Sequence, residues 1–210
     1  TRDNTMTHQH AIETVMKEYP VLPIRFSTIA ETEEEIVEKV LKPRYEEFEK
    51  LIAWVSDKKE LGLKVYWQEM KAILNEIVET NEAIKSFKEE IQKKSPNQAY
   101  YDQIEIGKMI EAALNEKREK ERDFLLKPLK APACDHKVHP TYIPELVVSA
   151  AFLVTKDAEP EFDQAVNKIQ EGYPGRYRIN YVGDAPPVNF VNIFIKWDRK
   201  SKEAQNVSPR

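Results

Sequence analysis

The most informative stretch of this sequence is RINYVGDAPPVNFV, residues 178–191. Its β-branched and aromatic residues favour strands, and we expect one strand over 176–182 and another over 190–197. Between them, Gly183-Asp184 predicts a reversal of the chain, and Pro186-Pro187 fixes φ and removes two backbone donors. Because a strand interrupted by two prolines cannot be central in a sheet, this stretch predicts a sheet edge or corner with a shaped turn.

Two further stretches stand upstream, VLPIRFSTI at 21–29 and ELGLKVYW at 60–67. The first resembles the pattern Leu-Pro-x-Arg-Phe-Gly-Thr-Val, and the second resembles Glu-Leu-Gly-Val-Lys-Val-x-Trp. Residues 178–191 are similar to Gly-Pro-x-Pro-Pro-Tyr-x-Phe-Val. In this order and spacing, the three patterns are typical of the GvpF/GvpL family of gas vesicle accessory proteins. The chain departs from them at Ser27, where the family has glycine, and at Asp184, where it has proline.

This resemblance implies an accessory or minor structural protein of gas vesicle formation, with no cofactor. Its expected partners are the small, apolar gas vesicle shell protein and other gas vesicle accessory proteins, which it would bind to assist assembly. Because exposed apolar strands template aggregation, a partner that covers them has a clear physical use. The family begins with an apolar strand ahead of the first helix, so the resemblance also implies a natural segment before residue 1.

Composition narrows the class of protein. The charged fraction of 32% exceeds the roughly 25% of average globular chains, while 41% of the residues are hydrophobic, enough for a core. A net charge of −4 argues against nucleic acid as the main partner. We find no membrane-spanning apolar run and no signal peptide. Cys134, the single cysteine, excludes an internal disulfide framework and favours the cytoplasm.

Residues 1–67 predict an N-terminal α+β domain. We expect a helix over 7–17, a strand over 21–29, and a helix that begins at the capping box of Thr32 with Glu35 and is kinked at Pro43. Residues 60–67 alternate between apolar and polar side chains, which predicts a further strand.

Residues 68–127 predict a long antiparallel helical hairpin. Its first arm, 68–94, carries an apolar heptad stripe with Thr80 in the one polar position. Ser95-Pro96-Asn97 breaks the helix, and the second arm follows. We expect these residues of the second arm to face inward: Tyr100, Ile104, Gly107, Ile110, Leu114 and Leu125. The almost wholly charged segment Glu116–Asp123 is expected to lie in water.

A proline-rich connector over 128–145 is expected to separate the hairpin from a C-terminal domain at 146–198, and 199–210 form a polar tail. In that domain, a strand buried on both faces (146–154), a helix (157–170) and two strands suggest a ferredoxin-like sheet. The predicted fold class is thus α+β, with two small sheet-and-helix domains linked by the hairpin.

The chain offers little for catalysis. We find no nucleophile elbow, phosphate loop or His-Glu-x-x-His motif, so we expect no enzyme. Cys134, His136 and His139 could offer three zinc ligands, but their spacing matches no standard module and we expect no metal site. A small metal-dependent enzyme that uses this connector is the alternative function.

The expected partner-binding residues come from the family patterns. We place the contact between the two sheet domains and the base of the hairpin, through strand addition or a groove for an amphipathic helix. The aromatic residues Tyr66, Tyr100 and Tyr101 are second-rank candidates. The main candidates are Arg25, Phe26, Gly62, Trp67, Gly183, Pro186, Pro187 and Phe190.

Overall fold

The structure is a computed structural model that describes residues 2–191, 193 and 195. It combines helices with an antiparallel sheet, which confirms the α+β class. The chain divides into two compact units, one formed by Asp57–Ala185 and the other by Thr1–Ser56 with the segment that begins at Pro186.

The sheet of the larger unit has the order β2-β3-β1-β4, and its neighbouring strands are antiparallel. Its strands are β1 (Lys58–Trp67), β2 (Asp135–Val138), β3 (Leu146–Thr155) and β4 (Tyr177–Ala185). With the intervening helices, the chain order is β-α-β-β-α-β, the order of the ferredoxin-like motif.

The position of β1 corrects the predicted domains. We expected residues 60–67 to belong to a separate sheet within 1–67, but β1 lies between β3 and β4. The β-α-β-β-α-β unit therefore spans 57–185 instead of 146–198. Strands that pair across so many residues leave no local pattern, and for this reason the sequence could not reveal which strands are partners.

The burial patterns of β1 and β3 were predicted correctly. In β1 the side chains of Leu61, Leu63, Val65 and Trp67 are buried, while Lys64 is exposed. Strand β3 is buried along almost its whole length, as the continuous apolar run predicted.

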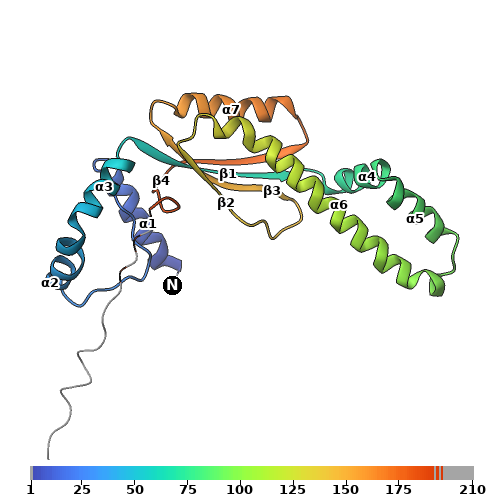
Figure 1. Ribbon diagram of the computed structural model, residues 1–210, viewed down its shortest axis with the longest axis horizontal. Helices are drawn as coiled ribbons and strands as arrows, with labels where there is room; N and C mark the ends of the chain where they lie inside the picture. The colour runs from blue at the N-terminus through green and yellow to red at the C-terminus, as the bar shows by residue number, and fades with distance from the viewer. Residues whose placement is uncertain (1, 192, 194, 196–210) are drawn as a thin grey trace, which may run out of the picture. The chain divides into compact units, whose positions relative to one another are not determined.

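Two helices cover one face of this sheet, α6 (Pro96–Lys130) and α7 (Glu159–Gly172) (Figure 1). Their apolar side chains join the odd-numbered residues of β1 in one core cluster. From α7, which was predicted as a helix over 157–170, this core takes Phe162, Val166 and Ile169.

The centre of the 178–191 stretch forms a β-bulge instead of the predicted reversal. Strand β4 continues through Gly183 and Asp184, and its register with β1 shifts between Glu60 and Gly62. Asp184 adopts a positive φ of 55°, which accommodates the extra residue. After Ala185, Pro186 and Pro187 accept backbone hydrogen bonds in a turn that extends to Val191. Residues 190, 191, 193 and 195 are not in a strand, and the rest of the expected strand lies outside the described residues.

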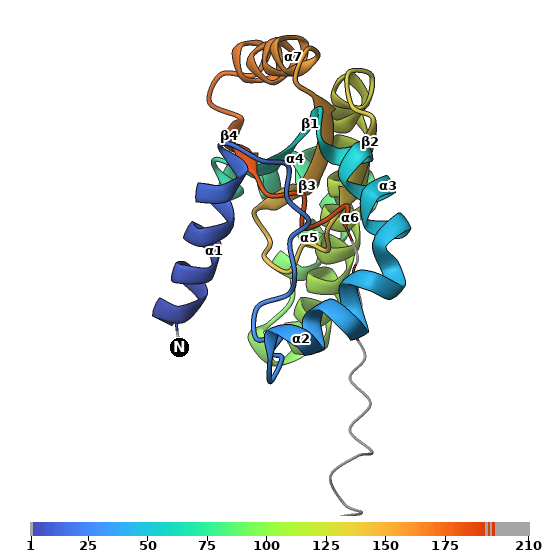
Figure 2. The ribbon, with the colours of Figure 1, turned by 90° about the vertical axis from the view of Figure 1, so that its left-hand side faces the viewer.

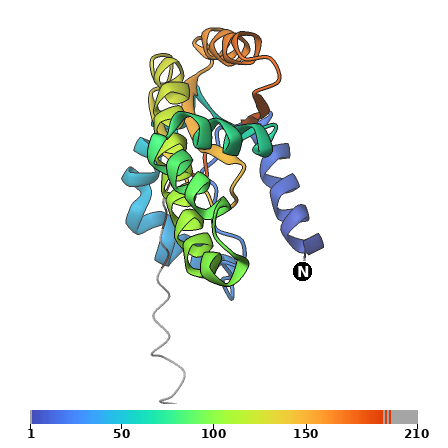
Figure 3. The ribbon, with the colours of Figure 1, turned by 90° about the vertical axis from the view of Figure 1, so that its right-hand side faces the viewer.

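The hairpin forms, but its first arm is broken. Helix α4 (Met70–Thr80) ends at the polar position of the stripe, and α5 (Glu82–Gln92) begins after Asn81. Asn81 caps α5, because its side chain accepts a 3.2 Å hydrogen bond from the Ile84 amide. Both short helices pack on α6 (Figure 3). Helix α6 begins at a capping box formed by Ser95 and Gln98.

The predicted seam of the second arm was partly wrong. Leu125 is fully buried, Leu114 is nearly so and Ile110 packs against the core, as expected. Tyr100, Ile104 and Gly107 are exposed instead, because the inner face near the tip is formed by other residues. These are Ala99, Ile106, Met109 and Ala113.

The predicted connector at 128–145 also needs correction. Helix α6 continues through Pro128 to Lys130, and the short strand β2 pairs with β3 through Val138↔Ala150 and the residues before it. Strand β2 reads Asp-His-Lys-Val, which has little strand preference, so its structure comes from pairing with β3.

The smaller unit is helical in its N-terminal part. It contains α1 (Arg2–Met16), which starts earlier than predicted, then α2 (Glu33–Ile36) and α3 (Tyr45–Val55). Figure 2 shows α2 and α3 joined by further helical turns, a π-helix at Val37–Leu41 and a 3-10 helix at Lys42–Arg44. The change of helix type surrounds Pro43, which cannot continue regular α-helical bonding.

The expected strand at 21–29 is a loop. Ser27 has a positive φ of 72°, and the Thr28 amide donates to the Arg25 carbonyl in a turn. Ser27 stands where the resembled family has glycine, the residue that adopts this conformation without strain. The turn and the prolines at 20 and 23 together explain why the apolar pattern did not become a strand.

Candidate functional site

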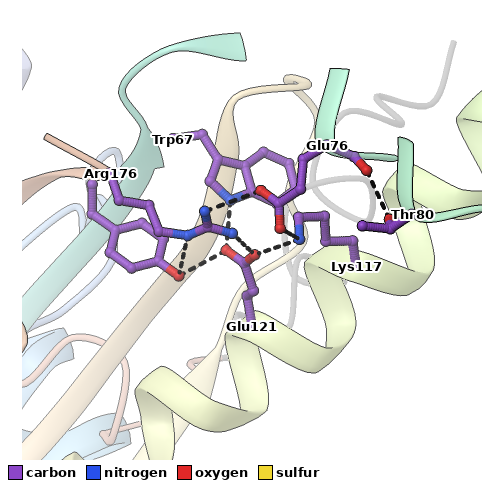
Figure 4. Close-up of polar contacts among 7 residues, drawn as sticks. Trp67, Glu76, Thr80, Lys117, Glu121 and Arg176 are labelled. Atoms are coloured by element: carbon purple, nitrogen blue, oxygen red, sulfur yellow. Dashed lines mark hydrogen bonds and ion pairs between the residues drawn. The ribbon is translucent and has the colours of Figure 1, made fainter. Parts of the chain in front are cut away.

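A polar network joins the hairpin to the sheet (Figure 4). We call it the hairpin root; it lies within the 57–185 unit and comprises Trp67, Glu76, Lys117, Glu121, Arg176 and Tyr177. Trp67 ends β1, Glu76 lies on α4, and Lys117 and Glu121 are one turn apart on α6. Tyr177 begins β4 and Arg176 directly precedes it, so the root connects four elements, β1, α4, α6 and β4.

Glu121 is the centre of the hairpin root. Its carboxylate accepts hydrogen bonds of 2.7 Å from the Trp67 indole and 2.7 Å from the Tyr177 hydroxyl. Arg176 also donates to it, and the Lys117 ammonium lies 3.1 Å away. Its side chain is only 13% exposed, so these donors replace most of the water around the charge.

The charges of the hairpin root stabilise one another. Burial alone would raise the pKa of Glu121, but the hydrogen bonds that it accepts, first that from Trp67, outweigh burial and lower the pKa below its ordinary value. The pKa of Glu76 is lowered in the same way, by Lys117 and Arg176 against burial. Burial raises the pKa of the Tyr177 hydroxyl, and its hydrogen bond to Glu121 raises it further. The root therefore holds carboxylates and a neutral phenol at neutral pH, an arrangement suited to anchoring the hairpin.

A groove lies beside the hairpin root, between the C-terminal part of α6 and α7, with a volume of about 710 Å³. We call it the α6–α7 groove. Phe124 and Tyr173 are 53% and 37% exposed and meet edge to face at 5.8 Å. The groove is lined by Phe124, Lys127, Pro128, Pro132, Glu161, Gln164, Ala165, Lys168, Ile169 and Tyr173.

A contact between two tyrosine rings connects the groove to the hairpin root. Tyr173, which lines the groove, packs edge to face on Tyr177 at 5.8 Å between ring centroids. The hydroxyl of Tyr177 in turn donates to Glu121. The polar network therefore positions the aromatic residues that border the groove.

The candidate residues from the sequence fall at three places. Arg25 lines a pocket of about 360 Å³ with Val188 and Val191, so within the smaller unit the structure brings the 21–29 stretch beside the part of the 178–191 stretch that follows Ala185. Phe26 lies on the same loop and contacts the His8 ring at 5.6 Å.

The remaining candidates of the 178–191 stretch lie at the bulge and just after it. Gly183 is in the bulge, against the Leu61 side chain, and Gly62 pairs with Val182 across from it. Pro186, Pro187 and Phe190 are buried in the turn that follows. Their burial fits a role in shaping the chain, and their role in partner binding stays a prediction.

Trp67 lies in the hairpin root and is nearly fully buried. The Arg118 guanidinium lies 5.6 Å from its ring centroid, so Trp67 is held by a cation on one side and by Glu121 through its indole nitrogen. Among the second-rank aromatic residues, Tyr66 is half-buried under Arg178, while Tyr100 and Tyr101 are exposed and contact each other.

The three possible zinc ligands do not converge. His136 lies in β2 and stacks on Phe152, Cys134 is exposed, and His139 follows the strand. In the part of the chain that the structure describes, no group of three His, Cys, Asp or Glu side chains is arranged to hold a metal ion. The metal-dependent alternative thus gains no support from the geometry.

Sequence reasoning missed the residues of the hairpin root and of the α6–α7 groove. Glu121 belongs to the charged segment that we expected to lie in water, yet it is the most enclosed charge of the network. A run of charges does not reveal which side chain faces the core. The Lys117–Glu121 spacing of four residues was the available signal, but the same spacing occurs in many exposed pairs.

No helix within the described residues is both long enough and apolar enough to cross a membrane.

Comparison with known proteins adds independent findings. The family model described as gas vesicle synthesis protein GvpL/GvpF matches residues 1–192. The chain is 25% identical to gas vesicle protein F of Dolichospermum flosaquae over 194 residues, covering 91% of this chain and 78% of that protein. It is 27% identical to gas vesicle protein F of Microcystis aeruginosa over 191 residues, covering 89% and 76%.

Solved structures agree with the fold. The crystal structure of the gas vesicle protein GvpF from Anabaena sp. PCC7120 superposes with a TM-score of 0.82 at 24% identity, covering 93% of this chain and 80% of that one. The GvpF crystal structure from Microcystis aeruginosa gives 0.73 at 26% identity, covering 92% and 79%. Since the family model spans nearly the whole chain, the protein belongs to the gas vesicle synthesis protein GvpL/GvpF family.

Proposed function

We propose that this protein assists gas vesicle assembly by binding the apolar shell protein and covering part of its surface until it is incorporated. Family membership supports an accessory role in gas vesicle formation. The shell protein as direct partner is the step that we add. Other accessory proteins are the further partners that the family suggests.

The observation that carries this proposal is the open α6–α7 groove. Apolar side chains such as Phe124 and Ile169 line it, and Phe124 remains about half exposed in the folded chain. Exposed apolar surface with a polar rim is typical of a protein interaction site. Aromatic residues are also enriched at such sites, because each contributes a large contact area.

The geometry favours binding over catalysis. The carboxylates of the hairpin root, Glu76 and Glu121, are engaged by cations and their pKa values are lowered, so neither is poised as a general acid or base near neutral pH. The matching family is one of gas vesicle synthesis and indicates no catalytic activity.

The test is co-expression of the shell protein with this chain, followed by capture of the chain and measurement of shell protein in the soluble fraction. We expect capture and increased solubility with the wild-type chain. The variant Phe124→Ala should reduce both, because it removes the most exposed large hydrophobic side chain of the groove.

Tyr142→Ala is the control, since Tyr142 is an aromatic residue that is even more exposed than Phe124 but does not line the groove. Circular dichroism spectra should show that all three chains are folded. If the folded wild-type chain neither captures nor solubilises the shell protein, the proposal is wrong. If Phe124→Ala behaves as wild type does, the groove is not the binding site.

The Pro186-Pro187 turn needs its own test, because the sequence analysis predicted that it contacts the partner. Replacing both prolines with alanine in the same assay addresses it. Unchanged folding and unchanged capture would exclude the turn from the contact.

A further inference from the structure

We propose that the α6–α7 groove accepts an amphipathic helix of a partner whose apolar face is flanked by carboxylates. This deepens the proposed function by giving the chemistry of the segment that the groove binds. It rests on the same groove but does not require that the shell protein be the partner.

The walls of the groove favour a helix as its occupant. Both walls are α-helices, so their backbone groups are paired within each helix, apart from the carbonyls of the last turns and the Phe124 carbonyl that Pro128 cannot reach with an N–H. An extended segment placed between them would bury amide and carbonyl groups with no backbone partner, which is costly. A helix satisfies its own backbone and presents only side chains to the groove. The volume of about 710 Å³ accommodates several such anchors.

The floor of the groove fits apolar anchors. Ile169 and Ala165 on α7 face Phe124 and Pro128 on α6, and Phe124 and Tyr173 border the groove as an aromatic pair. Apolar side chains at positions i, i+3, i+4 and i+7 of a partner helix form a stripe that matches such a surface.

The rim of the groove favours negative charge on the partner. Lys127 on α6 and Lys168 on α7 line opposite walls, and both are exposed. Within the residues that the structure describes, neither ammonium group takes part in an ion pair. Earlier lysines of α6 differ, because Lys117 and Lys120 are each bound to a carboxylate at 2.7 Å and 2.6 Å.

The local charge of the groove also contrasts with that of the chain. Two lysines and one carboxylate, Glu161, line the groove, whereas the chain as a whole carries a net charge of −4. A partner selected by overall charge would be basic, but a partner selected by this groove is acidic at its flanks. Charge complementarity of this kind determines orientation and partner choice more than raw affinity.

The experiment uses two synthetic 18-residue amphipathic peptides with the same apolar face of leucine and phenylalanine. One carries glutamate at its flanking positions and the other carries lysine. Fluorescence anisotropy measures the binding of each labelled peptide to the full chain at low and at physiological salt. We expect the wild-type chain to bind the glutamate peptide about tenfold or more tightly than the lysine peptide. Salt should reduce this difference.

Two charge-reversed variants locate the effect. The double variant Lys127→Glu with Lys168→Glu should bind the glutamate peptide about tenfold more weakly than the wild-type chain does, and it should bind the lysine peptide more tightly. The matched control is Lys71→Glu with Lys130→Glu, which changes the net charge equally at exposed lysines that do not line the groove. The control should keep the preference of the wild-type chain.

The inference is overturned if the wild-type chain binds both peptides equally, if the groove variant keeps its preference, or if the control loses preference to the same extent. The two proposals are tested separately. Peptide preference at the groove without capture of the shell protein supports the helix site and removes the shell protein as partner. Capture of the shell protein without peptide preference overturns the helix site and leaves the proposed function standing.

Discussion

The indole nitrogen of Trp67 donates a 2.7 Å hydrogen bond to the carboxylate of Glu121, which lies 54 residues later in the chain. This bond joins the end of the central strand β1 to the C-terminal half of helix α6. Through this bond, the charged side chain of Glu121 helps to hold the hairpin against the sheet.

Replacing Glu121 with glutamine should destabilise the 57–185 unit by about 1–3 kcal/mol, because the Trp67 indole and the Tyr177 hydroxyl lose a charged acceptor while they remain buried. Urea denaturation measures the loss, and hydrogen exchange should show it in α4 and α6. Glu116→Gln is the control, since Glu116 pairs only with Lys120 on the exposed face of the same helix. The control should leave stability close to that of the wild-type chain, because solvent screens this exposed ion pair. Equal effects of the two substitutions would contradict the central role of Glu121.

Stability of the hairpin root should fall in acid. The pKa of Glu121 is lowered in the folded chain, so its contribution is complete above the unfolded value of about 4.3 and is lost as pH falls through the lower folded value. Glu76 contributes in the same direction. Urea midpoints between pH 7 and pH 3 test this, and the decrease below pH 5 should be shallower in Glu121→Gln. An identical pH dependence in both chains would show that other groups cause the acid effect.

The break between α4 and α5 depends on Asn81. Asn81→Ala should cost about 1 kcal/mol, because the Ile84 amide loses its side-chain acceptor at the start of α5. Asn81→Asp keeps an acceptor oxygen and should remain close to wild type. The measurement is hydrogen exchange of the amides in the first turn of α5. Equal exchange in both variants would mean that the cap does not stabilise this helix.

Replacing Ser27 with glycine should make the smaller unit more stable. Its φ of 72° is strained for a residue with a Cβ atom, so Ser27→Gly is expected to stabilise the smaller unit by about 0.5–1 kcal/mol. Ser27→Ala keeps the Cβ and should bring no gain. Asp184→Gly at the bulge relieves a similar strain but removes the 2.8 Å ion pair with Lys59, so its gain should be smaller. Thermal unfolding measures the stability of each variant. A loss of stability in Ser27→Gly would contradict the claim that Ser27 is strained.

Local patterns predicted much of this fold. Burial determines both the alternation in β1 and the apolar run in β3, so these strands were predictable. Helix α7 was also predicted, and its apolar side chains are buried on one face. The turn at Ser27 and the bulge at Asp184 were missed because their positive φ angles occur at residues other than glycine. The partners of β1 and the surroundings of Glu121 depend on contacts between distant parts of the chain, which no local window contains.

The place of β1 within the sheet has a consequence for synthesis on the ribosome. Its two neighbours, β3 and β4, are translated well after it, and the hairpin is made in between. Helices α4, α5 and α6 need mainly contacts close in sequence and can form early, but β1 must wait for β3. Until then its apolar residues Leu61, Leu63 and Val65 have no sheet to join. A nascent chain stalled before residue 146 would therefore carry an unpaired apolar strand, the kind of surface that chaperones of newly made proteins bind.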